Sequence, residues 1–243
     1  MNVPMSEERL PRGPHRLTRA EVAESQRGRL YIAMLDAVAE RGYHPVTVAD
    51  LVARAKISRR TFYELFDSKE ACFAAAFETI VEVVQIRLTD AIRAAGQLDW
   101  RQLVHTSLSA YLEILSEEPA IARVLHIEAL IAGPVLTGYR NRMMAVFVDR
   151  MRAARELGGQ QGELTGSLPE MVFEFLIGGI DDRVRDCLQT RGSAALPDLA
   201  PMLAAVSLTL LGDTSRAGIV ALTNGDRAPL LGHAPAVGSR DSA

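Results

Sequence analysis

The sequence predicts an all-α protein of about nine helices, in which a small N-terminal domain precedes a larger helical one. Apolar residues recur every three or four positions along most of the 243-residue chain, which is the period of an amphipathic helix. No segment of the sequence shows sustained alternation of polar and apolar residues, so strands are not expected. Four prolines each precede an apolar run, as first-turn helix prolines do: Pro119, Pro134, Pro169 and Pro197.

The chain divides into four expected segments: a basic flexible arm at 1–20, a small domain at 21–66, a larger helical domain at 67–212 and a flexible tail at 213–243. The arm is either a segment that becomes ordered on a partner or a dispensable leader, and it has no apolar stretch typical of a secretory signal. The tail is rich in Gly, Pro, Ala and Ser with weak periodicity. The basic residues of the arm are Arg9, Arg12, Arg16 and Arg19.

Three short helices are expected in the small domain. The first spans Arg27–Gly42, with one apolar face and a glycine as its stop signal. Thr47 begins the second, with Asp50 placed to complete a capping box. Ser58 begins the third, which buries Phe62, Leu65 and Phe66 and leaves four side chains outward: Arg59, Arg60, Tyr63 and Glu64. Two short helices joined by a tight turn form a helix-turn-helix, whose second helix fits a DNA major groove.

The distribution of charge along the chain agrees with a DNA-binding domain better than the net charge of the whole chain does. The net charge is −3, but residues 1–70 sum to +2 and residues 71–243 to −5. Between Leu51 and Tyr63 there are four cations and no anion. Such a module can attract phosphate while the acidic remainder limits non-specific binding. The alternative for this run of cations is a solvated helix face.

Lys69 adds a second indication of an anionic partner. It falls in the first turn of the next helix, after Asp67 or Ser68, where a cation opposes the helix dipole. An external phosphate would reverse that penalty, because the free N–H groups and the ammonium would then bind it together. Tyr63 could donate a further hydrogen bond, or it could be a half-buried aromatic with a hydrated hydroxyl.

These residues resemble the DNA-binding domain of the tetracycline-repressor (TetR) family of bacterial transcription regulators. The matching positions are Ser58, Thr61, Phe62, Tyr63, Phe66, Ser68, Lys69 and Glu70. Three positions depart from the family pattern: Lys56 replaces the usual turn glycine, Arg60 a small residue and Leu65 a histidine. The resemblance implies DNA contacts from Thr47, Ser58, Arg59, Arg60, Thr61, Tyr63 and Lys69.

The larger domain begins with a long helix through Phe73 and Ile92 and continues with one through Trp100 and Leu115. Further helices are expected near 119–132, 134–157, 169–190 and 197–211. The helix near 169–190 is apolar nearly all round its first half, so it is either a wholly intramolecular core helix or one covered by a second subunit. The resemblance implies a homodimer formed with the last helix, through Phe175, Gly178, Gly179, Ile180, Met202 and Val206.

The helix near 119–132 has few polar residues, His126 and Glu128 among them. Buried polar groups need partners, so these two either satisfy neighbours within the core or line a pocket. The resemblance implies a pocket for a small apolar effector, with Phe77, Tyr111, His126, Glu128, Phe147, Met151 and Phe173 as candidate lining residues.

Catalytic and cofactor motifs are missing from the sequence. It contains no G-x-S-x-G, H-E-x-x-H, C-x-x-C or G-x-G-x-x-G, and Cys72 and Cys187 give neither a disulfide framework nor metal-ligand spacing. No run approaches 18 apolar residues, so no membrane span is expected. We therefore expect a cytoplasmic, non-enzymatic, cofactor-free repressor, released from a palindromic DNA operator by a small ligand. The alternative is an all-α enzyme or small-molecule carrier without specific DNA binding.

Overall fold

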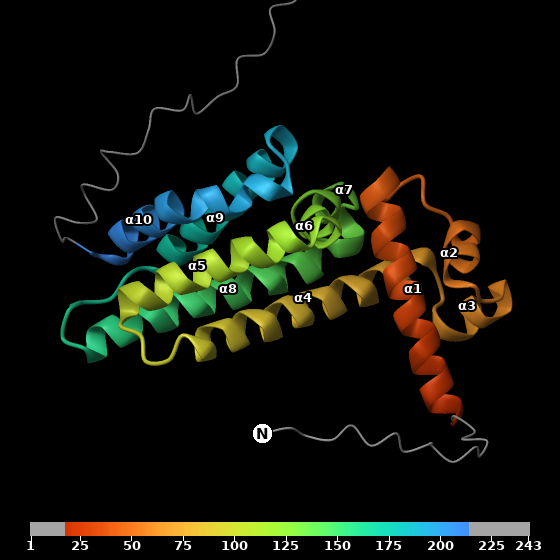
Figure 1. Cartoon of the computed structure of the whole chain (residues 1–243), viewed down its shortest axis with the longest axis horizontal. Coiled ribbons are helices and arrows are strands. Elements are labelled where there is room, and N and C mark those ends of the chain that lie inside the picture. The colour runs from red at the N-terminus through yellow and green to blue at the C-terminus, as the bar shows by residue number, and fades with distance from the viewer. Residues whose placement is uncertain (1–17, 214–243) are drawn as a thin grey trace, which may run out of the picture.

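The computed structural model describes residues 18–213, and within this range it contains helices and no strand, which confirms the all-α prediction. Figure 1 shows α1, α2 and α3 at one end of an elongated bundle, with α4 leading from them along its length. Helices α6 and α7 are two pieces of one interrupted helix, so α1 to α10 correspond to the expected nine.

Helix α1 spans Arg19–Arg41 and begins eight residues before the expected start at Arg27. Thr18 caps it in a capping box with Glu21. The sequence prediction of this start was wrong because the first two turns of α1 are mostly exposed and so carry no apolar period. The last two residues of the expected 1–20 arm therefore belong to a helix. Residues 1–17 of the arm lie outside the described residues.

The next three helices have the expected starting residues. Helix α2 spans Val48–Ala55 after Thr47, helix α3 spans Arg59–Leu65 after Ser58, and helix α4 spans Lys69–Ala94 after Ser68. Each of these three capping hydroxyls accepts a backbone N–H from the first turn. Asp50 completes the capping box of α2 as predicted.

The helix expected at 119–132 is irregular. After α5 (Trp100–Glu117), the chain forms α6 (Pro119–Arg123), a π-helical segment η1 (Val124–Glu128) and α7 (Ala129–Ile131). All five side chains of η1 are buried. π-Helical turns are rare and frequently occur at functional sites.

Helices α8 (Pro134–Gln160) and α9 (Glu170–Thr190) follow. Pro197 does not open the last helix as predicted. It lies inside the 3₁₀ segment η2 (Ser193–Leu199), and α10 spans Ala200–Leu211. Asp213 is buried and its carboxylate pairs with Arg101, so the expected mobile tail does not begin there. Residues 214–243 lie outside the described residues.

Helices α4, α5 and α8 pack against one another and form the body of the bundle, with α9 packed on α8 and α10 packed on α5 (Figure 1). Helix α1 contacts α4, α6 and η1 as well as α2. Because α1 packs on the larger domain too, the division at residue 66 stays a prediction.

One stretch, Ser193–Leu211, is long and apolar enough to cross a membrane by length and composition, with a mean hydropathy of 1.6. The sequence prediction that no segment is long and apolar enough to span a membrane is therefore corrected at this stretch. Pro197 interrupts the stretch with a 3₁₀ turn, and 39% of it is buried inside the fold against α5 and α9. Core helices of globular proteins pass the same test.

Candidate functional site

The turn between α2 and α3 has the conformation that its usual glycine would supply. Lys56 has φ 53° and ψ 48°, and it is the one non-glycine residue with positive φ among residues 18–213. A left-handed conformation costs an L-residue roughly 1–2 kcal/mol. Lys56 therefore carries this strain, and the turn keeps its helix-turn-helix geometry without glycine.

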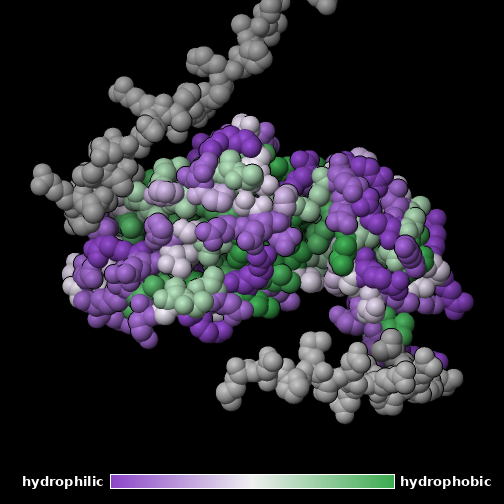
Figure 2. All heavy atoms as spheres, in the orientation of Figure 1, coloured by the Kyte–Doolittle hydropathy of each residue, from purple (hydrophilic) through white to green (hydrophobic). Residues whose placement is uncertain are grey.

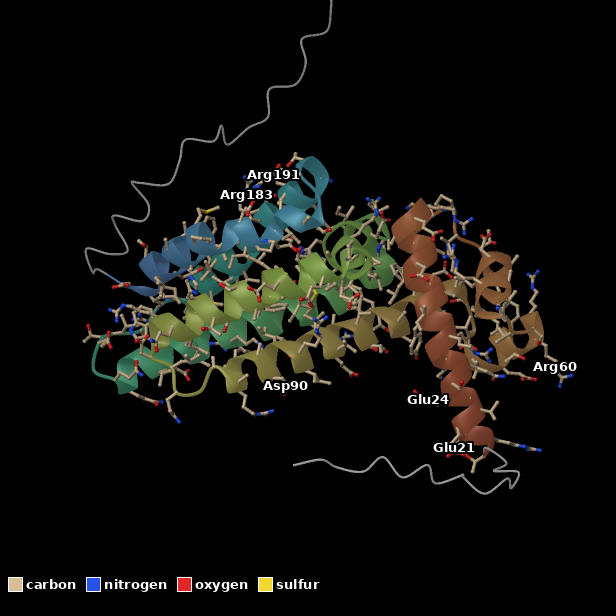
Figure 3. The ribbon with its side chains drawn as sticks, in the orientation of Figure 1. Glu21, Glu24, Arg60, Asp90, Arg183 and Arg191 are labelled. Carbon is tan, nitrogen blue, oxygen red and sulfur yellow. The ribbon has the colours of Figure 1, made fainter. Side chains whose placement is uncertain are left out.

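The outward face of α3 consists of polar and cationic groups. Arg59, Arg60 and Tyr63 are exposed, and Arg60 extends away from the body at the outer end of the molecule (Figure 3). Arg60 pairs with Glu64 one turn later, at 2.8 Å from Nε to Oε1. The Arg59 guanidinium lies 5.8 Å from the centre of the Tyr63 ring. The Ser58 and Thr61 hydroxyls are 2.8 Å apart, which fixes both at the start of the helix.

Arg54, one of the four cations, and Thr47, a predicted DNA contact, both bind other residues of the small domain. Arg54 donates to both carboxylate oxygens of Glu40 on α1, at 2.8 and 2.5 Å, so its charge fixes α2 to α1. The Thr47 hydroxyl accepts from the Asp50 N–H and donates to the Asp50 carboxylate. Of the four cations counted between Leu51 and Tyr63, only Lys56 and Arg59 have no carboxylate partner within the described residues.

Lys69 is half-buried and lies beside Tyr43, which belongs to the loop before α2. Its ammonium donates to the Tyr43 carbonyl at 3.3 Å and lies 4.2 Å from the centre of the Tyr43 ring. An ammonium has three donors, so two remain for an external anion. The contact fixes the position of Lys69 in the first turn of α4, four residues after the end of α3.

Tyr43 also connects the small domain to the larger one. Its N–H donates to Glu128 of η1 at 3.0 Å, its hydroxyl donates to Glu70 of α4 at 3.0 Å, and its ring stacks on Phe73 at 4.8 Å. Glu128 is fully buried, and its other oxygen accepts from Arg123 at 2.8 Å. Glu128 therefore binds the loop that leads into the helix-turn-helix.

A small cavity of about 30 Å³ lies in the larger domain between α4, α5, α8, α9 and η1. Its walls are mostly apolar, with several methionines and an aromatic ring: Leu108, Met143, Met144, Phe147 and Met151. A space of this size holds about one water, whereas ligand pockets measure roughly 300–1,000 Å³. The flexible methionine side chains are suited to making room for a larger molecule.

A buried polar network closes one side of this cavity. His126 Nδ1 lies 2.8 Å from Asp181, and His126 Nε2 lies 2.8 Å from the Tyr111 hydroxyl. Asp181 also accepts from Arg140 and Arg185, at 2.5 and 2.8 Å. Burial favours the neutral acid, but the hydrogen bond from His126 and the nearby cations outweigh it and lower the pKa of Asp181 to about 2.

The ionised Asp181 fixes the direction of one of these hydrogen bonds. A carboxylate can only accept, so His126 Nδ1 donates to it. Burial raises the pKa of Tyr111, so its hydroxyl keeps its proton in the hydrogen bond with His126 Nε2. Each of these buried groups thus has a partner, as the core alternative for His126 anticipated.

Four of the seven predicted ligand residues line the cavity: Tyr111, His126, Phe147 and Met151. Glu128 does not, because it lies two residues after His126, points to the opposite side of the helix and binds Tyr43 instead. Phe77 lies on a separate groove between α4 and α8. Phe173 is two helical turns, roughly 10 Å, before Ile180 along α9 and packs near Arg152.

The predicted dimer residues fall on two faces. Phe175 is 73% exposed, Met202 is 40% exposed, and Gly178 and Gly179 are exposed, whereas Val206 is half-buried. Ile180 is 7% exposed and lines the cavity, so its assignment to an external face was wrong. It lies seven residues after Phe173, on the buried side of α9. Figure 2 shows hydrophobic spheres among polar ones over α10, with hydrophilic spheres dominating the α1–α3 end.

Sequence reasoning missed Asp181, Tyr43 and Arg150. Asp181 follows Ile177 by four residues, so helical spacing places it on the buried face, and this signal was present in the sequence. Tyr43 and Arg150 gave no comparable signal, because their partners lie on other helices.

Residues 35–76, from α1 through the helix-turn-helix into α4, match the family described as bacterial regulatory proteins, tetR family. This match identifies a TetR-type helix-turn-helix within residues 35–76. The chain is 25% identical over 111 residues to the HTH-type transcriptional activator FasR of Mycolicibacterium smegmatis, a match spanning 46% of this chain and 50% of FasR. It is also 25% identical over 167 residues to the HTH-type transcriptional regulator YdgC of Bacillus subtilis, covering 68% and 82% of the two chains.

Solved structures of TetR-type regulators share the fold beyond the DNA-binding domain. The regulator FadR of Bacillus subtilis, in complex with stearoyl-CoA, has a TM-score of 0.66 at 18% identity, covering 75% of this chain and 97% of FadR. RolR in complex with resorcinol has a TM-score of 0.58 at 23% identity, covering 85% and 97%. These solved structures share with this chain an all-α fold in which an N-terminal helix-turn-helix precedes a larger helical part.

Proposed function

We propose that this protein is a homodimeric repressor that binds a palindromic DNA operator in the cytoplasm and leaves it when a small, mainly apolar molecule enters the cavity. The observation that carries the proposal is the connection between the two sites. His126 borders the cavity, and Glu128, two residues later in the same π-helical segment, binds Tyr43 in the loop before α2.

Operator binding rests on the outward face of α3. Arg59 and Arg60 stand at its N-terminal end, where a recognition helix reaches base edges, and Lys69 is held where a phosphate would pass. Two such helices about 34–36 Å apart would read successive major grooves. The exposed Met171, Phe175, Gly178 and Gly179 on α9, together with Met202 on α10, supply the apolar face that would join the subunits.

Release rests on enlargement of the cavity. A ligand larger than about 30 Å³ must displace side chains of the cavity wall, and His126 joins that wall to η1. Movement of η1 would shift or break the Glu128–Tyr43 hydrogen bond and so change the position of the DNA-binding domain. By linkage, an effector that prefers the altered state lowers the affinity for the operator, and the operator lowers the affinity for the effector by the same factor. The sign of regulation is a separate question, since the relative FasR is named an activator.

The test is a genome-wide pull-down of bound DNA, followed by footprinting and titration of the recovered site. Arg59→Ala should cost about 1–3 kcal/mol and relax the sequence preference, because it removes a base contact. Lys69→Ala should weaken all sequences alike and flatten the log K versus log salt slope by about 1.8 per dimer, at about 0.9 per phosphate. Salt-sensitive binding without any sequence preference would contradict the proposal, as an enzyme or carrier would show.

A further inference from the structure

The cavity holds one cation that no carboxylate neutralises. Arg150 of α8 lines it, and its guanidinium donates only to neutral oxygens of α4: Thr89 Oγ1 at 3.0 Å and Gln85 Oε1 at 3.5 Å. Its Nε is buried and has no hydrogen-bond partner among the described residues. Burial lowers the pKa of Arg150, which marks the cost of keeping this charge without a counter-ion.

Arg150 is half-buried, and the fully buried carboxylates of the larger domain all have cationic partners. Asp181, across the same cavity, has Arg140 and Arg185, while Asp213 has Arg101 and Glu128 has Arg123. A buried charge is normally paired, because desolvation without a partner is expensive. The missing partner of Arg150 is therefore a property of this cavity and not of the domain as a whole.

A second polar group faces the same space. Ser107 of α5 is buried, lines the cavity, and its hydroxyl makes no hydrogen bond within residues 18–213. A hydroxyl donor and a guanidinium Nε donor suit the two oxygens of one carboxylate. The remaining walls are mostly apolar, so a ligand there would carry little further charge.

A route into the cavity lies between α4 and α8. A groove of about 450 Å³ on that face is lined by Val81, Ile86 and Val146, and it shares Met143 with the cavity. Gln85, which holds Arg150, also lines this groove. A change in the side-chain conformation of Met143 would join the two spaces, and together they would accommodate a chain of several carbons.

We propose that the cavity binds an amphiphilic monocarboxylate, whose acid group pairs with Arg150 and Ser107 and whose apolar chain lies along Met143 toward the α4–α8 groove. The proposal deepens the proposed function, since it names the chemical class of the effector for the same cavity. Asp181 would repel a second acid group, so dicarboxylates should bind more weakly than monocarboxylates.

The experiment compares acids and alcohols of equal chain length on the full-length protein by calorimetry. The probes are hexanoate, octanoate and decanoate, each against its neutral 1-alkanol. In the wild type the preferred acid should bind about ten- to a hundredfold more tightly than its alcohol, which is the usual contribution of a charge-assisted hydrogen bond. Arg150→Met should abolish that preference, and Arg150→Lys should keep part of it.

Arg152→Met is the matched control, because it removes a cation two residues away on α8 that pairs with Asp149 and Glu170 outside the cavity. It should keep the acid preference. The acid-to-alcohol ratio of the wild type needs no variant, so the test stands even if Arg150→Met does not fold. Equal binding of acid and alcohol, or no binding of either, would overturn the inference.

Operator release is measured separately with the same probes. If alcohols bind as well as acids and both release the operator, the monocarboxylate inference fails and the proposed ligand-responsive function stands. If acids bind through Arg150 without changing operator affinity, the ligand class stands and the proposed effector role of the cavity fails.

Discussion

At the scale of single residues, the polar groups of the core decide how the domain tolerates acid. Asp181 is buried, ionised and bound by His126, Arg140 and Arg185, and these contacts hold its pKa at about 2. A carboxylate whose pKa is lowered by folding stabilises the fold above its unfolded pKa, near 4, and loses that contribution as the pH falls through its folded pKa.

Asp181→Asn should therefore remove a pH-dependent part of the stability. At pH 7 the variant should have a free energy of unfolding about 3 kcal/mol smaller, because the half-buried Arg140 and Arg185 lose their counter-charge. The gap between wild type and variant should narrow by about 2 kcal/mol as the pH falls from about 4.5 to 2. Urea unfolding of both proteins at several pH values measures this difference in free energy of unfolding. Asp182→Asn, at an exposed neighbour, is the control, and a gap that is constant with pH would refute the assignment.

At the scale of the elements, the glycines of α8 and α9 have different surroundings. A Cβ on Gly158 would lie 2.7 Å from Leu164 Cδ1 and 2.9 Å from Trp100 Cγ, whereas one on Gly159 would meet nothing closer than 3.8 Å. A Cβ on Gly178 or Gly179 would meet no atom of the chain within 4 Å. The close approach of Trp100 and Leu164 therefore explains why residue 158 is a glycine. Contacts within the chain do not explain the glycines at 178 and 179.

Gly158→Ala and Gly159→Ala make a matched pair within one helix. Gly158→Ala should lower the free energy of unfolding by about 1–3 kcal/mol, since the methyl group overlaps the rigid Trp100 ring. Gly159→Ala should raise it by up to about 1 kcal/mol, because alanine favours the helix and meets no obstacle. Thermal unfolding of both variants measures the difference, and equal effects would show that the packing around Trp100 yields.

Gly179→Leu tests the proposed subunit contact. A Cβ at this position meets no atom of the described residues within 4 Å, so the monomer fold should be kept while close approach of a partner helix is blocked. Sedimentation should show a dimer for the wild type and a monomer for the variant, with operator affinity falling steeply. Gly28→Leu on α1, equally free of neighbours, is the control and should remain dimeric. A dimeric Gly179→Leu would place the interface elsewhere.

At the scale of the whole molecule, the contact between Glu128 and Tyr43 links the two domains. Tyr43 also binds Lys69 and Glu70 at the start of α4, so the loop before α2 is fixed to both the long helix and η1. The position of the DNA-binding domain thus depends on a segment that also lines the cavity.

Glu128→Ala should loosen this link. It leaves the buried Tyr43 N–H without its acceptor, which costs about 1–3 kcal/mol. Hydrogen exchange of the Tyr43 amide should then become faster, and operator affinity should fall without any ligand. His126→Ala is the matched comparison from the same segment and should leave Tyr43 protected. Unchanged exchange and unchanged operator affinity in Glu128→Ala would show that the link does not position the domain.

The local signals of the sequence determined the fold class and the helix-turn-helix. Caps at Thr47, Ser58 and Ser68, apolar periodicity, and the strained turn at Lys56 are properties of neighbouring residues, so they could be predicted without coordinates. The early start of α1 was missed because its first turns are solvated and carry no apolar period.

Only the tertiary structure decided which polar groups meet. His126 and Glu128 are two residues apart, yet the π-helical η1 turns one to the cavity and the other to Tyr43, 85 positions before it. Helical spacing places residues two apart on nearly opposite sides, but it does not say which distant group each of them meets. The resemblance placed Ile180 at the subunit interface, whereas the structure buries it against the cavity. Arg150 has no signal in its own neighbourhood, because what distinguishes it is that no carboxylate of the described residues pairs with it. Contacts between distant segments depend on packing, and packing is not encoded in any short stretch of the chain.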